Sequence, residues 1–184
     1  MTRDNSTEAH SLCVQPAFLI GTYNEDGTPN FCPITWVSVT WDTNQYLLIL
    51  SMFGSKKTKE NIARTGLLSA NLVSTDMLEL LDYFGSRSGK DGQKDALSFE
   101  YEDGAVLRVP TLSASRWIYE LDVCKTVQTG DSNTYFCRMK NVQFIEELKN
   151  ADGIDLTLLA PVVYSGMYHS IGNCLGGIGD FYCY

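Results

Sequence analysis

The sequence predicts a mainly β domain in which antiparallel strands close, or nearly close, into a barrel. Short apolar stretches rich in β-branched and aromatic residues recur along the chain, and turn-forming residues separate them. Helical spacing of apolar residues appears in only two short stretches. No linker or internal repeat divides the 184 residues, so we expect one domain over residues 1–184, with residues 1–12 as a flexible arm.

The first strands are expected at residues 17–23, 30–40 and 46–52. A turn with the sequence NEDGTP, in which Asp26-Gly27 suits a positive φ, separates the first two, and residues 41–45 form the next turn. Strands joined by such short turns predict an antiparallel meander. Pro33 has no backbone N–H to donate, so it should lie at a sheet edge or a bulge.

The remaining extended segments are expected at residues 67–73, 106–112, 117–129 and 134–145. The last two predict a long hairpin, turned at residues 130–133. A helix is expected from an N-cap at Asp76 to Gly85, whereas residues 96–104 fit either a short helix or coil. The tail after residue 163 is rich in glycine and aromatic residues, so it should wrap over the body without regular structure.

The stretch at residues 51–74 is the strongest candidate for a binding site. Lys56 and Lys57 end a polar loop after a strand, Thr58 is placed as a helix N-cap, and Gly66 as the residue that ends that helix. A helix N-terminus offers unpaired N–H groups and a partial positive charge, so this stretch could seat a phosphate. The alternative is an ordinary connection whose lysines are only solvated, and the spacing is not that of a P-loop or a dinucleotide-binding fingerprint.

The composition excludes several classes of partner. A net charge of −8 disfavours general binding to nucleic acid or to anionic membranes, although it allows a local basic pocket. We see neither a secretory signal nor an apolar run long enough to span a membrane, so a cytoplasmic protein is expected. The cysteines form no C-x-x-C pair and no histidine joins them at ligand spacing, so no metal site is expected, and Cys124 and Cys137 should be free thiols.

Several segments, taken in order, resemble a known family. They are AFLIGTYNEDGTPN, NFCPITWVSV, KKTKENIARTGLLSANLV, DYFGSRSGKDGQK, VPTL, YELDVC and LAPVVYSGMYHSIG. Together they resemble the flavin-reductase-like, FMN-binding split barrels, in particular the flavoredoxin-like branch, over about residues 16–176. The resemblance implies a six-stranded antiparallel split β-barrel with Greek-key connections, FMN as cofactor, and a homodimer with the flavin near the subunit interface.

The resemblance also implies which residues hold the cofactor. The phosphate would lie at residues 55–58, with Ser55, Lys57 and Thr58, and the isoalloxazine or ribityl chain beside Thr35, Trp36 and Val37. The same cleft would be lined by Ser51, Met52 and Asn71. Structural alternatives stay open: Trp36 as core or interface packing, Thr58 as a helix cap only, and Ser51 and Asn71 as partners of local backbone groups. Two further candidates are Ser88 and Lys94, in the glycine-rich loop, and His169 could donate a proton on the substrate side.

Two departures from the family pattern bear on activity. Reductases of the family commonly carry Gly-Asp-His after the hairpin turn, but here Ser132 follows Gly130-Asp131, and Trp41-Asp42 replaces a proline pair. The first departure weakens the case for reduction by a nicotinamide more than the case for flavin binding. Three functions therefore stay open: an NAD(P)H-dependent flavin reductase or flavoredoxin-like oxidoreductase, a non-enzymatic FMN-binding electron carrier, and a flavin-free small-molecule binder. No catalytic residue is assigned.

Overall fold

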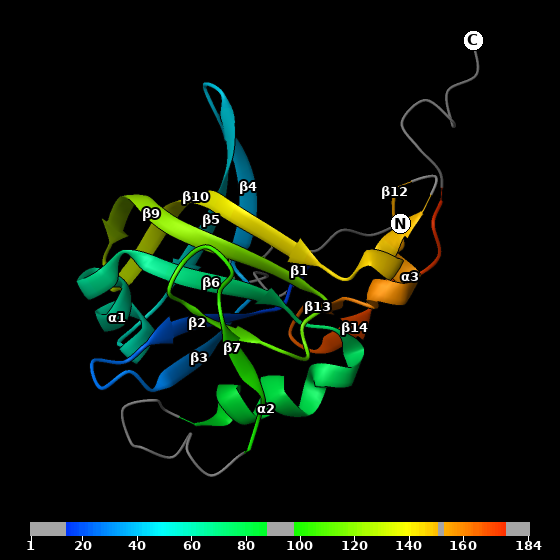
Figure 1. Ribbon diagram of the computed structural model, residues 1–184, viewed down its shortest axis with the longest axis horizontal. Coiled ribbons are helices and arrows are strands. Elements are labelled where there is room, and N and C mark those ends of the chain that lie inside the picture. Colours follow the sequence, from blue (N-terminus) through cyan, green and yellow to red (C-terminus); the bar gives the residue numbers. More distant parts are fainter. Residues whose placement is uncertain (1–13, 88–97, 151–152, 176–184) are drawn as a thin grey trace, which may run out of the picture.

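The computed structural model describes residues 14–87, 98–150 and 153–175, and an antiparallel sheet dominates it (Figure 1). Within these residues the largest sheet has seven strands in the order β3-β2-β6-β9-β10-β5-β4. Its strands are β2 (Phe18–Tyr23), β3 (Pro29–Ile34), β4 (Val37–Asp42), β5 (Gln45–Met52), β6 (Leu67–Leu72), β9 (Trp117–Thr129) and β10 (Ser132–Phe144). The mainly β class predicted from the sequence is therefore confirmed.

The sheet curls into a barrel that stays open along one side. Its hydrogen-bonded ladder ends at β3 and β4, yet β3 also contacts β5, so the two ends of the sheet approach each other. Six strands line one apolar core; its buried members include Ile20, Ile34, Leu50, Leu68, Leu121 and Tyr135, one from each of β2, β3, β5, β6, β9 and β10. Helix α1 (Lys57–Thr65) adds Ile62 to this core. This is the split six-stranded barrel that the sequence predicts, with β4 outside the six.

Side chains on β2 alternate between two cores, as a strand with both faces covered requires. Phe18 and Ile20 point into the barrel, whereas Leu19 packs outside it with Leu81 and Phe84 of helix α2 (Leu78–Ser86). The short helix η2 (Thr75–Met77) precedes α2 and has Ser74, not the predicted Asp76, as its N-cap. Helix α2 thus covers the outer face of the β2–β3 hairpin.

The predicted strand at residues 30–40 is wrong, because this run forms two strands at opposite ends of the sheet. Strand β3 pairs with β2 and strand β4 with β5. Between them the chain bends at Thr35, whose carbonyl accepts a hydrogen bond from the Val37 N–H at 2.9 Å. The predicted meander is consequently two separate hairpins. Pro33 lies in the end strand β3, where a missing N–H is tolerated, as predicted.

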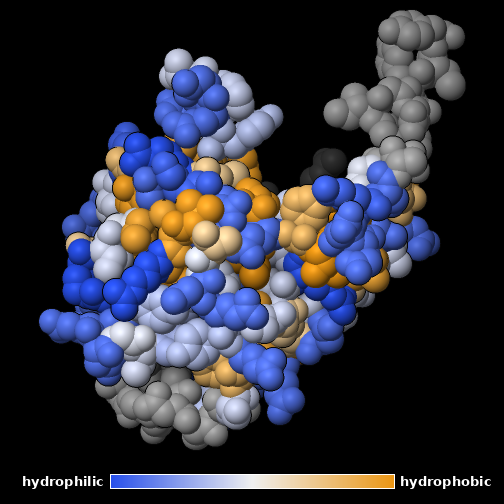
Figure 2. Space-filling model, viewed as in Figure 1, coloured by the Kyte–Doolittle hydropathy of each residue, from blue (hydrophilic) through white to orange (hydrophobic). Residues whose placement is uncertain are grey.

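The β4–β5 hairpin projects from the barrel as an arm (Figure 1). Its turn has Thr43 at a φ of 38°, and Figure 2 shows a hydrophilic tip on the face in view. Behind the tip, Val39, Trp41 and Tyr46 are exposed, and the rings of Trp41 and Tyr46 meet edge to face at 4.7 Å between centroids. The arm therefore carries apolar surface that the described part of the chain does not cover.

The long β9–β10 hairpin was predicted correctly and turns at Gly130, which has a φ of 55°. Its register shifts between Phe136 and Cys137, opposite Cys124. Both cysteines are free thiols, as predicted, and burial raises the pKa of Cys137 to about 12. Such a thiol is protonated and unreactive at neutral pH.

A buried carboxylate on β9 fixes the neighbouring loop to the sheet. Glu120 is fully buried and accepts hydrogen bonds from the backbone N–H groups of Ala105 (2.9 Å), Val106 (2.9 Å) and Leu107 (2.6 Å). The amides of Asn141 (2.7 Å) and Gln143 (2.8 Å) on β10 complete its shell. Burial raises the pKa of this carboxyl, but the hydrogen bonds outweigh burial and hold the pKa below its usual value.

The other elements are short and lie around the barrel. They are β1 (Gln15–Pro16), β7 (Tyr101–Asp103), β8 (Pro110–Leu112), η4 (Glu146–Leu148), β11 (Lys149–Asn150), β12 (Gly153–Ile154), α3 (Leu156–Leu159), β13 (Val162–Tyr164) and β14 (Tyr168–Ser170). The stretch at residues 96–104 was expected to be a short helix or coil, but its described part contains strand β7 instead. The tail was predicted to lack regular structure, but β14 pairs with β13. None of the described helices is long and apolar enough to cross a membrane.

Candidate functional site

A pocket of about 300 Å³ lies where the start of α1, strand β3 and the end of α2 meet. It is lined by Asn30, Cys32, Pro33, Ser55, Lys56, Lys57, Thr58, Phe84, Gly85, Ser86 and Arg87. Three of the residues predicted to hold a phosphate, Ser55, Lys57 and Thr58, are therefore brought together around one cavity.

The first turn of α1 faces this pocket, and its N-cap residue makes no side-chain capping hydrogen bond. The N-cap is Lys56, whose φ of −139° and ψ of 140° are extended, and the helix begins at Lys57. The prediction that Thr58 is the N-cap was wrong, because the chain turns helical earlier. An uncapped N-terminus keeps its first N–H groups and the positive end of the helix dipole available to an anion. Gly66 ends the helix at a φ of 69°, as predicted.

Buried hydrogen bonds determine the orientation of the Thr58 hydroxyl. Thr58 is 1% exposed, and its Oγ1 accepts a hydrogen bond from Asn30 Nδ2 at 2.9 Å. The same Asn30 amide donates to Thr22 Oγ1 at 3.3 Å, and Asn61 Nδ2 donates to Thr22 Oγ1 at 3.1 Å. The Thr58 oxygen accepts from Asn30, so its own hydrogen is not used in that contact and can be donated to another acceptor.

The sequence reasoning missed Asn30 as a pocket residue. Its signal was weak, because Asn30 follows a turn and reads equally well as a turn residue. Asn61, by contrast, follows Thr58 by three residues in the same helix, so that both face the β2–β3 hairpin. Thr58 and Asn61 thus anchor the first turns of α1 to the β2–β3 hairpin, Thr58 through Asn30 and Asn61 through Thr22.

Charged side chains around the pocket are mostly cationic. The Lys57 ammonium lies 3.4 Å from Glu60, and both side chains are partly exposed, so this pair is weak. Arg87 places its guanidinium 4.2 Å from the centre of the Tyr83 ring. Lys56, Lys57 and Arg87 together give the pocket a local positive charge, although the net charge of the protein is −8.

The loop before α1 is held rigidly from its other side. Lys59 Nζ donates to the carbonyls of Gly54 at 3.0 Å and Asp131 at 2.9 Å, and the Gly54 N–H donates to the Asp131 carbonyl at 3.2 Å. Gly54 has a φ of 71°, which favours glycine. The turn of the β9–β10 hairpin thus fixes the loop that carries Ser55, and Lys59 serves this contact.

The residues predicted beside the flavin ring form a second group. The Ser51 N–H donates to the Trp36 carbonyl at 2.9 Å, and the Ser51 and Thr134 hydroxyls are hydrogen-bonded at 2.7 Å. The Trp36 side chain is 46% exposed. Thr35 precedes Trp36 between β3 and β4, and Val37 begins β4, so this group lies a few residues after Cys32 and Pro33 of the pocket along the chain.

Met52 and Asn71 are not brought to either group. Met52 is 0% exposed within the barrel core. Asn71 is also 0% exposed; its amide donates to the Leu19 carbonyl and to Ser69 Oγ, both at 2.9 Å, and its oxygen accepts from the Leu112 N–H at 2.8 Å. Asn71 therefore acts as a partner of local backbone groups, which was the structural alternative left open from the sequence. The Met52 side chain does not reach the cleft because it occupies an inward-facing position on β5.

Of the remaining candidates, His169 lies in the described part of the chain and does not line the pocket. Ser88 and Lys94 lie outside the described residues. His169 is exposed on β14, where it pairs with Val163 of β13. Among the described residues, no group of three or more His, Cys, Asp or Glu could hold a metal ion.

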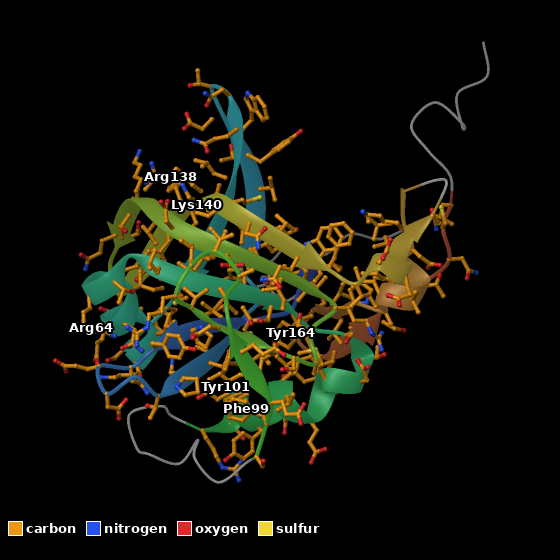
Figure 3. The ribbon with its side chains drawn as sticks, in the orientation of Figure 1. Arg64, Phe99, Tyr101, Arg138, Lys140 and Tyr164 are labelled. Carbon is orange, nitrogen blue, oxygen red and sulfur yellow. The ribbon has the colours of Figure 1, made fainter. Side chains whose placement is uncertain are left out.

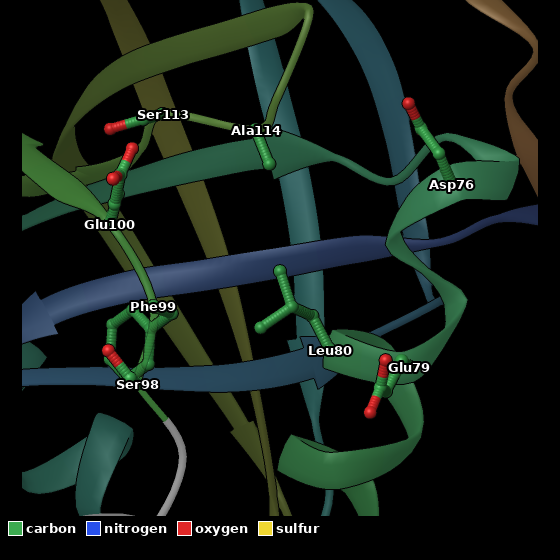
Figure 4. Close-up of a pocket in the computed structure, with 8 residues that line it drawn as sticks. All are labelled: Asp76, Glu79, Leu80, Ser98, Phe99, Glu100, Ser113 and Ala114. Carbon is green, nitrogen blue, oxygen red and sulfur yellow. The ribbon is translucent and has the colours of Figure 1, made fainter.

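A larger pocket of about 440 Å³ lies between α2 and the segment that enters β7 (Figure 4). Its walls carry the carboxylates of Asp76, Glu79 and Glu100, so it would repel a phosphate. Asp76 is paired with Arg116 at 2.6 Å. Phe99 of this pocket neighbours Tyr101, with 6.1 Å between ring centroids (Figure 3). The larger pocket is therefore a poorer candidate for a phosphate site than the smaller pocket at the start of α1.

The curled antiparallel sheet, whose end strands β3 and β4 leave it open along one side, is that of a split-barrel protein. The chain belongs to the flavin reductase like domain family, whose family model matches residues 10–172. No curated protein sequence matches it closely enough to count as a relative.

Solved structures share the fold over almost the entire chain. Flavoredoxin of Desulfovibrio vulgaris (Miyazaki F) has a TM-score of 0.86 at 21% identity, covering 97% of this chain and 99% of its own. Flavoredoxin from Methanosarcina acetivorans has a TM-score of 0.86 at 22% identity, covering 98% and 97%. An FMN-binding protein from Thermus thermophilus, solved with bound 1-cyclohex-2-enone, has a TM-score of 0.75 at 20% identity, covering 92% and 93%. At these identities the likeness establishes the split-barrel fold.

Proposed function

We propose that this chain binds FMN non-covalently, with the phosphate in the 300 Å³ pocket, and acts as a flavin reductase-like or flavoredoxin-like oxidoreductase. In this role it passes electrons from NAD(P)H or a redox partner to an acceptor. The observation that carries the proposal is the convergence of the uncapped α1 N-terminus, the Lys57 ammonium and the buried Thr58 hydroxyl on one cavity. Membership of the flavin reductase like domain family supports it.

The pocket residues fit a phosphate monoester in charge and in hydrogen bonding. Such a group carries about −1.5 to −2 charges at pH 7 and offers only strong acceptors. The pocket supplies donors: the first-turn N–H groups of α1, the Thr58 hydroxyl and the ammonium groups of Lys56 and Lys57. A neutral or cationic ligand would leave these donors unpaired, so the site favours an anion.

The ring would lie toward Trp36 and Ser51. Bound FMN supplies the redox chemistry, because the flavin can accept a hydride and release electrons singly. The chain's own part would be to hold that ring: the exposed Trp36 side chain offers an aromatic face, and the Ser51–Thr134 hydroxyl pair offers polar contacts. Thr35 and Val37 would flank it on the same segment.

A second candidate function is an FMN-binding electron carrier that does not oxidise NAD(P)H. The identity of Ser132 favours this function. Ser132 follows Gly130-Asp131 in the β9–β10 hairpin, at the position where reductases that this chain resembles commonly have a histidine. A carrier needs a bound flavin near the surface and no site for nicotinamide. A flavin-free binder on the same barrel is the third alternative, because a fold does not fix a function.

We also propose a homodimer, as the resemblance to the split-barrel flavoproteins implies, and a cytoplasmic location. The β4–β5 arm supports the dimer, since Val39, Trp41 and Tyr46 are exposed on it. A second copy that covers this surface would remove exposed apolar area from water.

An absorption spectrum before and after adding FMN tests the proposal. A flavin spectrum that is shifted from free FMN and retained through desalting is expected, whereas no retained flavin at micromolar FMN would leave only the flavin-free alternative. Steady oxidation of NADH or NADPH by the loaded protein would then support the reductase over the carrier.

The phosphate assignment has its own test. The double variant Lys57→Ala, Thr58→Ala should weaken FMN binding by tenfold or more, since it removes a charge and a buried donor (about 1.5–3 kcal/mol for a charged hydrogen bond). Lys140→Ala is the matched control, because Lys140 is an exposed cation on β10 away from the pocket (Figure 3). Unchanged affinity in the double variant would remove the assignment.

A further inference from the structure

The wall of the pocket formed by α2 presents an electrostatic problem for any anion. Phe84, Gly85 and Ser86 line the pocket and belong to the last turn of this helix. The last carbonyls of a helix have no intrahelical partners and carry its partial negative charge. A phosphate drawn in by the N-terminus of α1 would therefore meet the repelling end of α2.

Arg87 lies where its positive charge can offset the partial negative charge at the end of α2. It is the first residue after α2, in an extended conformation with a φ of −127° and a ψ of 144°, and it lines the pocket. Its guanidinium lies over the Tyr83 ring, 4.2 Å from the centre. Stacking on an aromatic ring limits the rotamers of a long side chain and leaves the guanidinium N–H groups directed outward in the plane.

We propose that Arg87 determines the selectivity of this site for phosphorylated flavin, that is, for FMN over riboflavin. The proposal rests on the proposed FMN function and deepens it by naming the residue that reads the phosphate from the α2 side. The guanidinium offers a fork of donors that matches two oxygens of a phosphate, in addition to neutralising the helix end. Riboflavin lacks the phosphate, so it gains nothing from this contact.

Arg87 differs from the cations of α1 in what it can discriminate. Lys57 is close to Glu60, and Lys56 precedes a helix whose own dipole already attracts an anion. Among the described lining residues on the α2 side, Arg87 is the one that carries a positive charge. Removing Arg87 should therefore weaken FMN binding more than removing one of the two lysines at the start of α1.

Dissociation constants for FMN and for riboflavin, measured by quenching of flavin fluorescence, test the proposal. Arg87→Ala should weaken FMN binding about tenfold or more and leave riboflavin binding unchanged. Arg87→Lys should recover only part of the selectivity, because a lysine keeps the charge but loses the fork and the stacking. Arg138→Ala is the matched control: it removes an arginine on β10, paired with Asp122, outside the pocket.

The outcomes separate this inference from the function on which it rests. If the wild-type protein binds FMN but Arg87→Ala keeps the same ratio of FMN to riboflavin affinity, the inference is overturned and FMN binding stands. Equal weakening toward both flavins also overturns it, since a phosphate contact cannot affect riboflavin. If the wild-type protein binds no FMN, the proposed function falls and the inference with it.

Discussion

Asn30 on β3 donates its side-chain amide to the hydroxyl of Thr58 in the first turn of α1, at 2.9 Å, and both side chains are buried. This hydrogen bond connects the end strand of the sheet to the helix that forms the phosphate pocket. The connection positions the start of α1 against the barrel, and it leaves the Thr58 hydroxyl hydrogen available to another acceptor.

Replacing Thr58 by valine should affect both stability and binding. Valine keeps the shape but removes the hydroxyl, which leaves a buried Asn30 donor with only Thr22 as partner. We expect the free energy of unfolding to fall by about 1–3 kcal/mol, measured by urea denaturation, and FMN affinity to fall about tenfold. Thr58→Ser, which keeps the hydroxyl, is the control and should bind FMN nearly as the wild type does. Equal affinities for the valine and serine variants would contradict the role of the hydroxyl.

Stability should depend on pH through Glu120. Its hydrogen bonds lower the pKa in the folded state below the unfolded value of about 4.5, so the carboxylate stabilises the fold above that pH. This contribution is lost as the pH falls through the lower, folded pKa. Glu120→Gln should lose about 2–4 kcal/mol at pH 7, because its amide group presents N–H groups to backbone donors.

The measurement is urea denaturation of wild type and Glu120→Gln at pH 7 and pH 3. The difference between the two proteins should be large at pH 7 and should shrink at pH 3, because below the unfolded pKa the unfolded chain binds a proton that the folded carboxyl resists. Asp122→Asn on the same strand is a suitable control, since Asp122 is partly exposed and makes a surface ion pair with Arg138. A constant difference at both pH values would argue against the carboxylate as the source.

The sequence allowed most of the fold to be predicted, because strand and helix patterns are local. The segments that became β2, β5, β6, β9 and β10 were all recognised, and so was the end of α1 at Gly66. The failure at residues 30–40 has a physical cause: an apolar run shows that a strand is present but does not show which strand it pairs with. The bend at Thr35 follows from pairing of β3 with β2 and β4 with β5, which is tertiary information.

The phosphate pocket could be predicted in part for the same reason. Ser55, Lys57 and Thr58 belong to one local motif, so their proximity followed from the sequence. Asn30 and Arg87 reach the pocket from β3 and from the end of α2, and only the folded chain brings them there. Asn71 was placed in the cleft by the family resemblance, whereas here it satisfies the backbone of β2 and β8.

Gly104 is expected to tolerate no side chain. A Cβ at this position would lie 2.5 Å from the Leu107 carbonyl oxygen and 2.6 Å from Glu120 Oε2, closer than real contacts. Gly104→Ala should displace the loop from Glu120 and lower the midpoint of thermal unfolding. Gly172→Ala is the matched control, because a Cβ there meets nothing within 4 Å. If both alanine variants melted at the same temperature, the loop would not be held by Glu120 as described.

The exposed aromatic pair of the arm gives a prediction about assembly. The Trp41 side chain is 57% exposed and the Tyr46 side chain 61%, on a hairpin that extends away from the barrel core. If a second copy covers this pair, Trp41→Glu should convert a dimer into a monomer, because a buried carboxylate without a partner is costly. Sedimentation velocity at several concentrations measures the change, and Asn44→Asp at the hydrophilic turn is a charge-matched control that should remain dimeric. A wild-type monomer at micromolar concentration would show the dimer proposal to be wrong. A dimer that survives Trp41→Glu would place the interface on another surface.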